Sequence, residues 1–218
     1  MTNDVFVSVG RTFTEGQERF VREVERLLWE RDLHPRTMGR GEWSSEQPLR
    51  AVEAVMDQCD GTVVVAFERW YLRDATEQRG GDQERVVRGE SLPTVWNQIE
   101  AAMAYVKDLP LLVIVERGLI PEGLLEGRYD WYVQVLPLEP SALRTPEALG
   151  RLADWQLRVE AVHLSRQTAG RRRSLPDPSS MTVAELLGAL RPSQVWAILA
   201  AVSGLLVSAF LLGRQLAP

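Results

Sequence analysis

The stretch 93–116 reads PTVWNQIEAAMAYVKDLPLLVIVE, and its pattern sets the fold of the chain. Apolar or small residues recur at helical spacing over 95–106, and Pro93 suits a first helical turn, where its missing N–H costs nothing. The run 111–116 is continuously apolar, which is typical of a strand buried on both faces. We therefore expect a helix that feeds a buried strand. One carboxylate, Glu100, lies in this helix where an apolar face is expected.

The same alternation of strand and helix extends to both sides of this stretch. A run at 5–9 precedes a helix that begins after Thr14, and the valine-rich run 62–67 follows a helix that begins at Pro48. A poorer strand is expected at 33–38, at a sheet edge because of Pro35, and a last strand at 131–136. This order predicts an α/β fold with a doubly wound, mainly parallel, five-stranded sheet. The polar segment 73–91 is expected to be a long loop, either a functional lid or disordered.

We expect four successive regions along the chain. They are an α/β domain over 1–140, a helical extension over 141–170, a basic hinge with a short helix over 171–192, and a transmembrane helix over 193–214.

The transmembrane prediction depends on an uncharged run of 18 residues, 195–212. As a helix it would measure about 27 Å, close to the thickness of the bilayer hydrocarbon. A buried core helix is the alternative interpretation. Arginines 171–173 and Arg191 precede the run and only Arg214 follows it, so the positive-inside rule predicts a single-pass inner-membrane protein with a cytoplasmic N-terminal domain. No cleavable apolar segment is found near Met1.

The composition argues against several classes of function. A net charge of −5 gives no bulk attraction to nucleic acid. The chain has one cysteine, Cys59, and two histidines, so neither an intramolecular disulfide nor a metal site is expected.

The candidate site residues follow from the expected sheet. In open α/β sheets, ligands bind beyond the carboxyl ends of the strands, where the strand order reverses. The first strand ends at Gly10 and Arg11, and the third ends at Glu68 and Arg69. The helix after the third strand can direct three further side chains into the same crevice: Trp96, Asn97 and Glu100.

These residues resemble two known families. The opening VFVS (5–8) and the W-x-x-x-E helix (96–100) resemble TIR domains, which implies a flavodoxin/TIR-like fold. The larger pattern, with Cys59 and an aspartate before the valine-rich strand and LPLLVIVE at 109–116, is also similar to nucleoside 2-deoxyribosyltransferase-like proteins. In both families a glutamate acts at the anomeric carbon of a ribose. Asn97 departs from the TIR pattern, which has a cysteine there. With the membrane segment, the whole resembles effectors of bacterial antiviral, abortive-infection-type signalling.

Two functional hypotheses follow. In the first, the domain binds a nucleotide-derived signal, with Arg11 and Arg69 on phosphate and Trp96 stacked on a base, and ligand binding drives homo-oligomerisation and membrane disruption. In the second, the chain is an N-glycosidase for NAD or a related nucleoside, in which Glu100 is the nucleophile or stabilises the transition state and Asn97 bonds the ribose hydroxyls. Glu68 is the candidate second carboxylate. A tail-anchored scaffold without a ligand is a third interpretation.

Overall fold

The structure, a computed structural model, describes residues 3–120, 122–127 and 131–173. The chain divides into two units, Met1–Gln167 and Thr168–Pro218. The described part of the second unit is the end of one helix, and everything below concerns the first unit. The expected short helix and the expected transmembrane segment, 193–214, lie outside the described residues. Within the described residues, no helix is long and apolar enough to cross a membrane.

The secondary structure alternates as the sequence predicts. The elements are β1 (Asn3–Val9), α1 (Glu15–Trp29), β2 (Leu33–Arg36), α2 (Pro48–Met56), β3 (Gly61–Ala66), β4 (Trp70–Leu72), β5 (Ala75–Glu77), β6 (Arg85–Val87), β7 (Glu90–Leu92), α3 (Val95–Val106), β8 (Leu111–Glu116), the 3-10 helix η1 (Gly123–Leu125), β9 (Val133–Leu136), the 3-10 helix η2 (Pro140–Arg144) and α4 (Pro146–Arg173).

The central sheet has five strands in the order β2-β1-β3-β8-β9. Every neighbouring pair is parallel, which confirms the predicted α/β class and the five-stranded parallel sheet. The strand with Pro35, β2, lies at an edge, as expected from a residue that cannot donate to a ladder on both sides. The strand order reverses between β1 and β3, because the chain moves from β1 to one edge and then returns to β1's other side.

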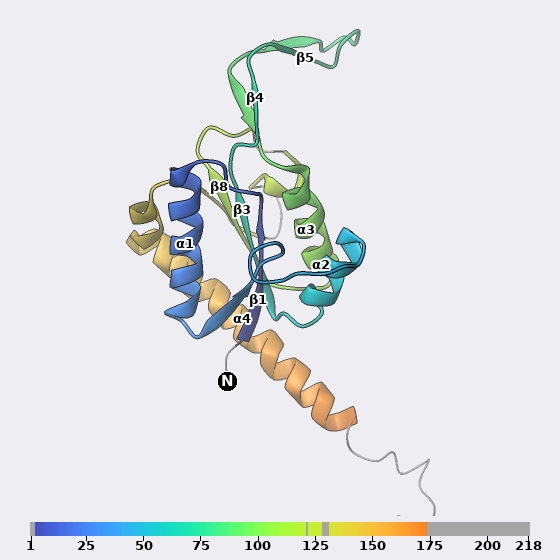
Figure 1. Cartoon of the computed structure of the whole chain (residues 1–218), viewed down its shortest axis with the longest axis vertical. Helices are drawn as coiled ribbons and strands as arrows, with labels where there is room; N and C mark the ends of the chain where they lie inside the picture. Colours follow the sequence, from blue (N-terminus) through green and yellow to red (C-terminus); the bar gives the residue numbers. More distant parts are fainter. Residues whose placement is uncertain (1–2, 121, 128–130, 174–218) are drawn as a thin grey trace, which may run out of the picture. The chain divides into compact units, whose positions relative to one another are not determined.

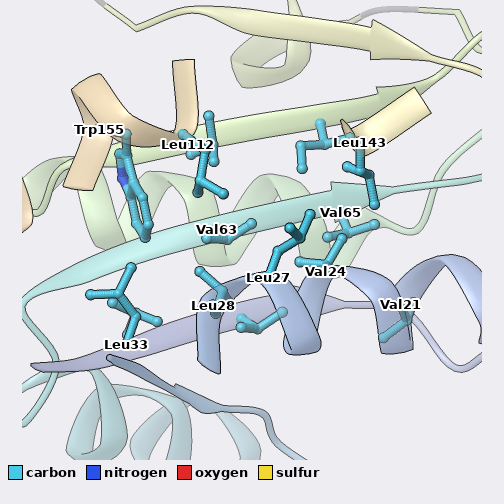
Figure 2. Packing of buried hydrophobic residues seen from close by; sticks show 14 of the residues in the cluster. Val21, Val24, Leu27, Leu28, Leu33, Val63, Val65, Leu112, Leu143 and Trp155 are labelled. Carbon is cyan, nitrogen blue, oxygen red and sulfur yellow. The ribbon is translucent and has the colours of Figure 1, made fainter. Parts of the chain in front are cut away.

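Helices cover both faces of this sheet (Figure 1). The helices α1 and α4 share a core with the side chains of β3 that point to their face, Val63 and Val65. Figure 2 shows this cluster, in which Leu28 of α1 lies below Val63 of β3 and Trp155 of α4 lies above it. The alternate residues Val64 and Ala66 belong to the cluster on the other face, which also contains Ala101 of α3. Because successive side chains of a strand point to opposite faces of the sheet, β3 contributes residues to both cores.

The orientation of α3 differs from the expectation for an apolar helix stripe. Val95 and Val106, two members of that stripe, are 69% and 81% exposed. The buried residues of α3 are instead small or polar: Asn97, Glu100, Ala101 and Ala104. The two alanines let the helix approach the sheet closely, and this turns Glu100 inward.

The polar segment 73–91 is not a loop. Together with β4, which precedes it, the segment forms an arm of two antiparallel ribbons, β4 with β7 and β5 with β6, which projects from the carboxyl edge of the sheet (Figure 1). Each strand has three residues, too few to give the sequence a recognisable alternation. The ribbons turn through residues with positive φ, among them Gly80 and Gly89.

Gly61 is the point at which α4 contacts the start of β3. A Cβ atom there would lie 2.5 Å from Cγ2 of Val159 and 3.1 Å from Cζ2 of Trp155. Trp155 cannot move away easily, because its indole N–H donates to the carbonyl of Pro110 at 3.0 Å. The close helix–strand approach therefore requires glycine.

We predict that Gly61→Ala lowers the free energy of unfolding by about 1–3 kcal/mol, the cost of an overpacked core. Thermal and urea unfolding of the full-length chain in mild detergent measure the change. Gly150→Ala is the matched control, since a Cβ at Gly150 meets nothing within 4 Å, and it should be neutral or slightly stabilising in helix α4. If Gly61→Ala were as stable as wild type, the close contact of Gly61 with α4 would be wrong.

Candidate functional site

The carboxyl ends of β1 and β3 form the switch point at which ligands bind in open α/β sheets. A cavity of about 220 Å³ lies there. Three segments line it, the end of β1 with its following turn, the end of β3 with its following turn, and the first turns of α3. Its lining residues are Val9, Gly10, Arg11, Phe67, Arg69, Thr94, Trp96 and Glu100.

Five of the seven residues proposed from the sequence thus surround one cavity: Gly10, Arg11, Arg69, Trp96 and Glu100. Hollows of about 400–510 Å³ occur elsewhere on the described surface, but no buried carboxylate lines any of them. The chemistry, rather than the volume, distinguishes the cavity at the switch point.

Glu100 is the buried carboxyl group of this cavity and is 8% exposed. Burial raises its pKa from 4.5 to about 7, and a hydrogen bond from the Ser8 side chain offsets part of that rise. Both protonation states are therefore populated at neutral pH. A carboxyl group with this property in a cavity is typical of catalytic sites, although structural networks also produce such shifts.

Asn97 is buried, 1% exposed, and does not line the cavity. Its amide nitrogen donates to the Ser8 hydroxyl at 3.1 Å and approaches the carbonyl oxygens of Ser8 and Val65 at 3.4 Å each. Asn97 therefore ties α3 to the ends of β1 and β3. Its expected contact with ribose hydroxyls would require this amide nitrogen to leave its protein partners.

Glu68, the expected second carboxylate, also does not line the cavity. Its side chain accepts a hydrogen bond from the hydroxyl of Ser91 at the base of the arm. Its backbone N–H donates to the carboxylate of Glu116 at 2.7 Å. Burial raises the pKa of Glu116, and this hydrogen bond from Glu68 partly offsets the rise. The pair Glu68–Glu116 thus anchors the arm beside the cavity.

Two cationic side chains of the cavity have no acidic partner. Among the described residues, no ion pair or side-chain hydrogen bond involves Arg11 or Arg69, whereas most arginines of the α1 and arm surfaces are paired. Both guanidinium groups are free to bind an anion. Trp96 is 42% exposed and presents part of its ring to the same cavity.

Four residues of the site are not among the seven candidates: Val9, Phe67 and Thr94, which line the cavity, and Ser8, which accepts a hydrogen bond from Asn97. Ser8 is a hydroxyl residue, 0% exposed, in the run 5–9, which is otherwise apolar, and this polar interruption was the available indication. Thr94 caps α3, and its Cγ2 would lie 3.2 Å from a Cβ added at Gly10. In the described residues, no cluster of three or more histidine, cysteine or acidic side chains could hold a metal ion.

Comparisons with known proteins add little. No family model and no curated protein matches the chain. Among solved structures, the chain is similar to the Clostridium botulinum CMP N-glycosidase BcmB, with 11% sequence identity and a TM-score of 0.41 over 64% of this chain and 93% of that one. A likeness this weak carries no argument about activity, and the proposals below depend on the site itself.

The buried carboxyl group makes a prediction about stability. Because the pKa of Glu100 is raised in the folded state, the folded chain keeps a proton that the unfolded chain loses between about pH 4.5 and 7, and stability falls over that range. Glu100→Gln removes this penalty. We expect the variant to gain about 1–3 kcal/mol over wild type at pH 8 and much less at pH 4.5.

Urea unfolding at both pH values measures this difference. Glu46→Gln, on an exposed glutamate far from the cavity in sequence, is the control and should show no pH-dependent gain. If Glu100→Gln had the same effect on stability at both pH values, the conclusion that Glu100 is buried with a raised pKa would be wrong.

Proposed function

We propose that the chain is an N-glycosidase that cleaves a nucleoside or nucleotide in the cavity at the switch point. One observation carries this proposal: a carboxyl group with its pKa near 7 shares a small cavity with two unpaired arginines and a partly exposed tryptophan. These groups match the parts of a nucleotide. The arginines fit a phosphate, Trp96 fits the face of a base, and Glu100 fits the sugar between them.

The proposed reaction breaks the bond between C1′ and the base nitrogen. The bonding electrons leave with the base, and water adds hydroxide to C1′ and a proton to the base. Positive charge develops on the sugar during this step, and the carboxylate form of Glu100 stabilises it or bonds to C1′. The dry surroundings that raise the pKa of Glu100 also strengthen its attraction to that charge.

The volume of the cavity restricts the substrate. Pockets for drug-sized ligands measure about 300–1,000 Å³. The cavity of about 220 Å³ lies below this range, so the second half of NAD would lie outside it. The proposal therefore favours a mononucleotide or nucleoside over NAD.

A second function is supported by the same arginines and tryptophan, which bind a ligand whether or not it is cleaved. In this alternative, the domain is the sensor of a membrane-anchored antiviral effector, and a nucleotide-derived signal drives oligomerisation of the chain and disruption of the inner membrane by the segment 193–214. Glu100 then holds the ribose hydroxyls and breaks no bond.

We predict that the full-length chain releases free base from at least one member of a panel of ribonucleosides, deoxyribonucleosides, their 5′-monophosphates and NAD. Glu100→Gln should reduce the rate at least about 100-fold, the contribution of a positioned acid or base, while Glu46→Gln should retain it. Chromatography of the released base gives the rate. Ligand-dependent oligomerisation in detergent without release of base from any member would reject the glycosidase and favour the sensor.

The two arginines give a further prediction. Arg11→Ala and Arg69→Ala should each weaken binding of a 5′-monophosphate by about 10- to 100-fold, because each removes a charge-assisted hydrogen bond, and should leave binding of the parent nucleoside nearly unchanged. Calorimetry on the Glu100→Gln background avoids turnover. Arg73→Ala is the control, an exposed arginine outside the cavity. Equal losses for nucleotide and nucleoside would contradict the phosphate assignment.

A further inference from the structure

The outward face of α3 is apolar along its whole length. Four residues recur at helical spacing on the side away from the sheet, and together they form the outward stripe: Val95, Ile99, Ala102 and Val106. The two valines at its ends are 69% and 81% exposed, and the two residues between them are partly exposed. The sequence of α3 includes a single charged residue, Glu100, which is buried on the opposite side.

A surface helix of a globular protein normally carries charged residues on its outer face. Helix α1, which covers the other side of the sheet (Figure 1), follows this rule with exposed ion pairs such as that between Glu15 and Arg19. The outward stripe breaks the rule, although water would favour polar residues there. A contiguous exposed apolar face of this kind is typical of a surface that another molecule covers.

The order of the residues in the stripe fits a second copy of the chain. The separations along the sequence are four, three and four, so they are the same when read from either end. A two-fold axis midway between Ile99 and Ala102 would place each valine against the other valine of the second copy, and Ile99 against Ala102. A symmetric dimer requires such reciprocal contacts, and the bulky isoleucine would fill the space that the small alanine leaves.

We propose that the outward stripe of α3 binds the same stripe of a second copy of this chain, with the two helices antiparallel. The pairing depends on this face alone, so it holds whether the cavity cleaves its ligand or only binds it.

The charges at the two ends of α3 support the antiparallel direction. At its C-terminal end, Lys107 pairs with both Asp57 and Glu53, so the acidic groups outnumber the lysine. At its N-terminal end, the exposed charged side chains of the cavity are Arg11 and Arg69. An antiparallel pair directs the acidic end of each helix towards the basic end of the other, and it also opposes the two helix dipoles. A parallel pair would bring like ends together.

The pairing would also fix one wall of each cavity. Thr94, Trp96 and Glu100 line the cavity from the same helix whose outer face would be covered. A dimer would therefore hold two cavities, each built on a helix that the second copy supports from outside.

Thiol cross-linking of the full-length chain in mild detergent tests the pairing and its direction. Chains that carry Val95→Cys and chains that carry Val106→Cys are co-expressed, and each is also prepared alone. A short bismaleimide should join chains in the mixture at least about 10-fold faster than in either form alone, because antiparallel pairing brings position 95 to position 106 and raises its effective concentration there. Wild type is the blank, since its Cys59 is 0% exposed.

Ala102→Arg, added to both cysteine forms, should slow this cross-linking at least about 10-fold. The two-fold axis presents the change twice, and each arginine would be buried without an acidic partner. Leu157→Arg is the matched control, on a leucine of α4 that is 66% exposed, and it should leave the rate unchanged. Arginine is a good helix former, so the melting temperatures of both variants should stay near that of wild type.

Three results would overturn the proposal. Cross-linking of Val95→Cys with itself as fast as the mixture would show parallel helices. A mixture that reacts no faster than the blank would show that no second copy covers the stripe. A rate unchanged by Ala102→Arg would show that the chains associate elsewhere, for example through the segment 193–214.

Measuring the release of base separates this inference from the proposed function. Slow cross-linking in a chain that releases base would reject the pairing and retain the glycosidase. Fast cross-linking in the mixture, with no base released from any nucleoside or nucleotide, would retain the pairing and reject the glycosidase.

Discussion

The burial of Glu100 against the ends of β1 and β3 is the constraint on which the site depends. A carboxyl group loses most of its hydration there, and this costs free energy unless neighbouring groups compensate for the lost water. Ala101 and Ala104 bring α3 close to the sheet, and Asn97 fastens its first turn to the two strand ends. The cavity exists because the turns after these strands diverge, as they do at any reversal of strand order. The electrostatics of the site therefore follow from the topology of the sheet.

The sheet could be predicted from the sequence because the pattern that indicates each strand lies within the strand itself. Continuous apolar runs give the central strands, and Pro35 gives an edge. The arm could not be predicted, since three-residue strands carry no measurable periodicity and depend on pairing across the ribbon. Glu100 and Trp96 of α3 do line the cavity as expected, but the exposure of the apolar stripe of α3 was not predicted, for a different reason. Periodicity identifies the most apolar face, but close contact with a sheet selects the smallest residues, and in α3 these two faces differ.

The candidate site could likewise be predicted only in part. The ends of strands locate backbone positions, and five of the seven proposed residues do line one cavity. The direction of a side chain is set by neighbours from distant parts of the chain, which the sequence does not reveal. Glu68 turns to Ser91 of the arm, and Asn97 turns to Ser8. Whether the gathered residues bind a nucleotide, as the sequence suggested, stays a prediction.

The inward face of α3 holds a carboxyl group where selection for stability alone would favour an apolar side chain. Random substitution at position 100 has many stabilising outcomes available, because almost any apolar side chain would suit the surroundings better than a carboxyl group. Mutational drift under selection for foldability alone would therefore erase Glu100 early and leave the rest of the α/β domain intact. We therefore expect a related chain to keep a carboxyl group at this position only where the cavity is still used.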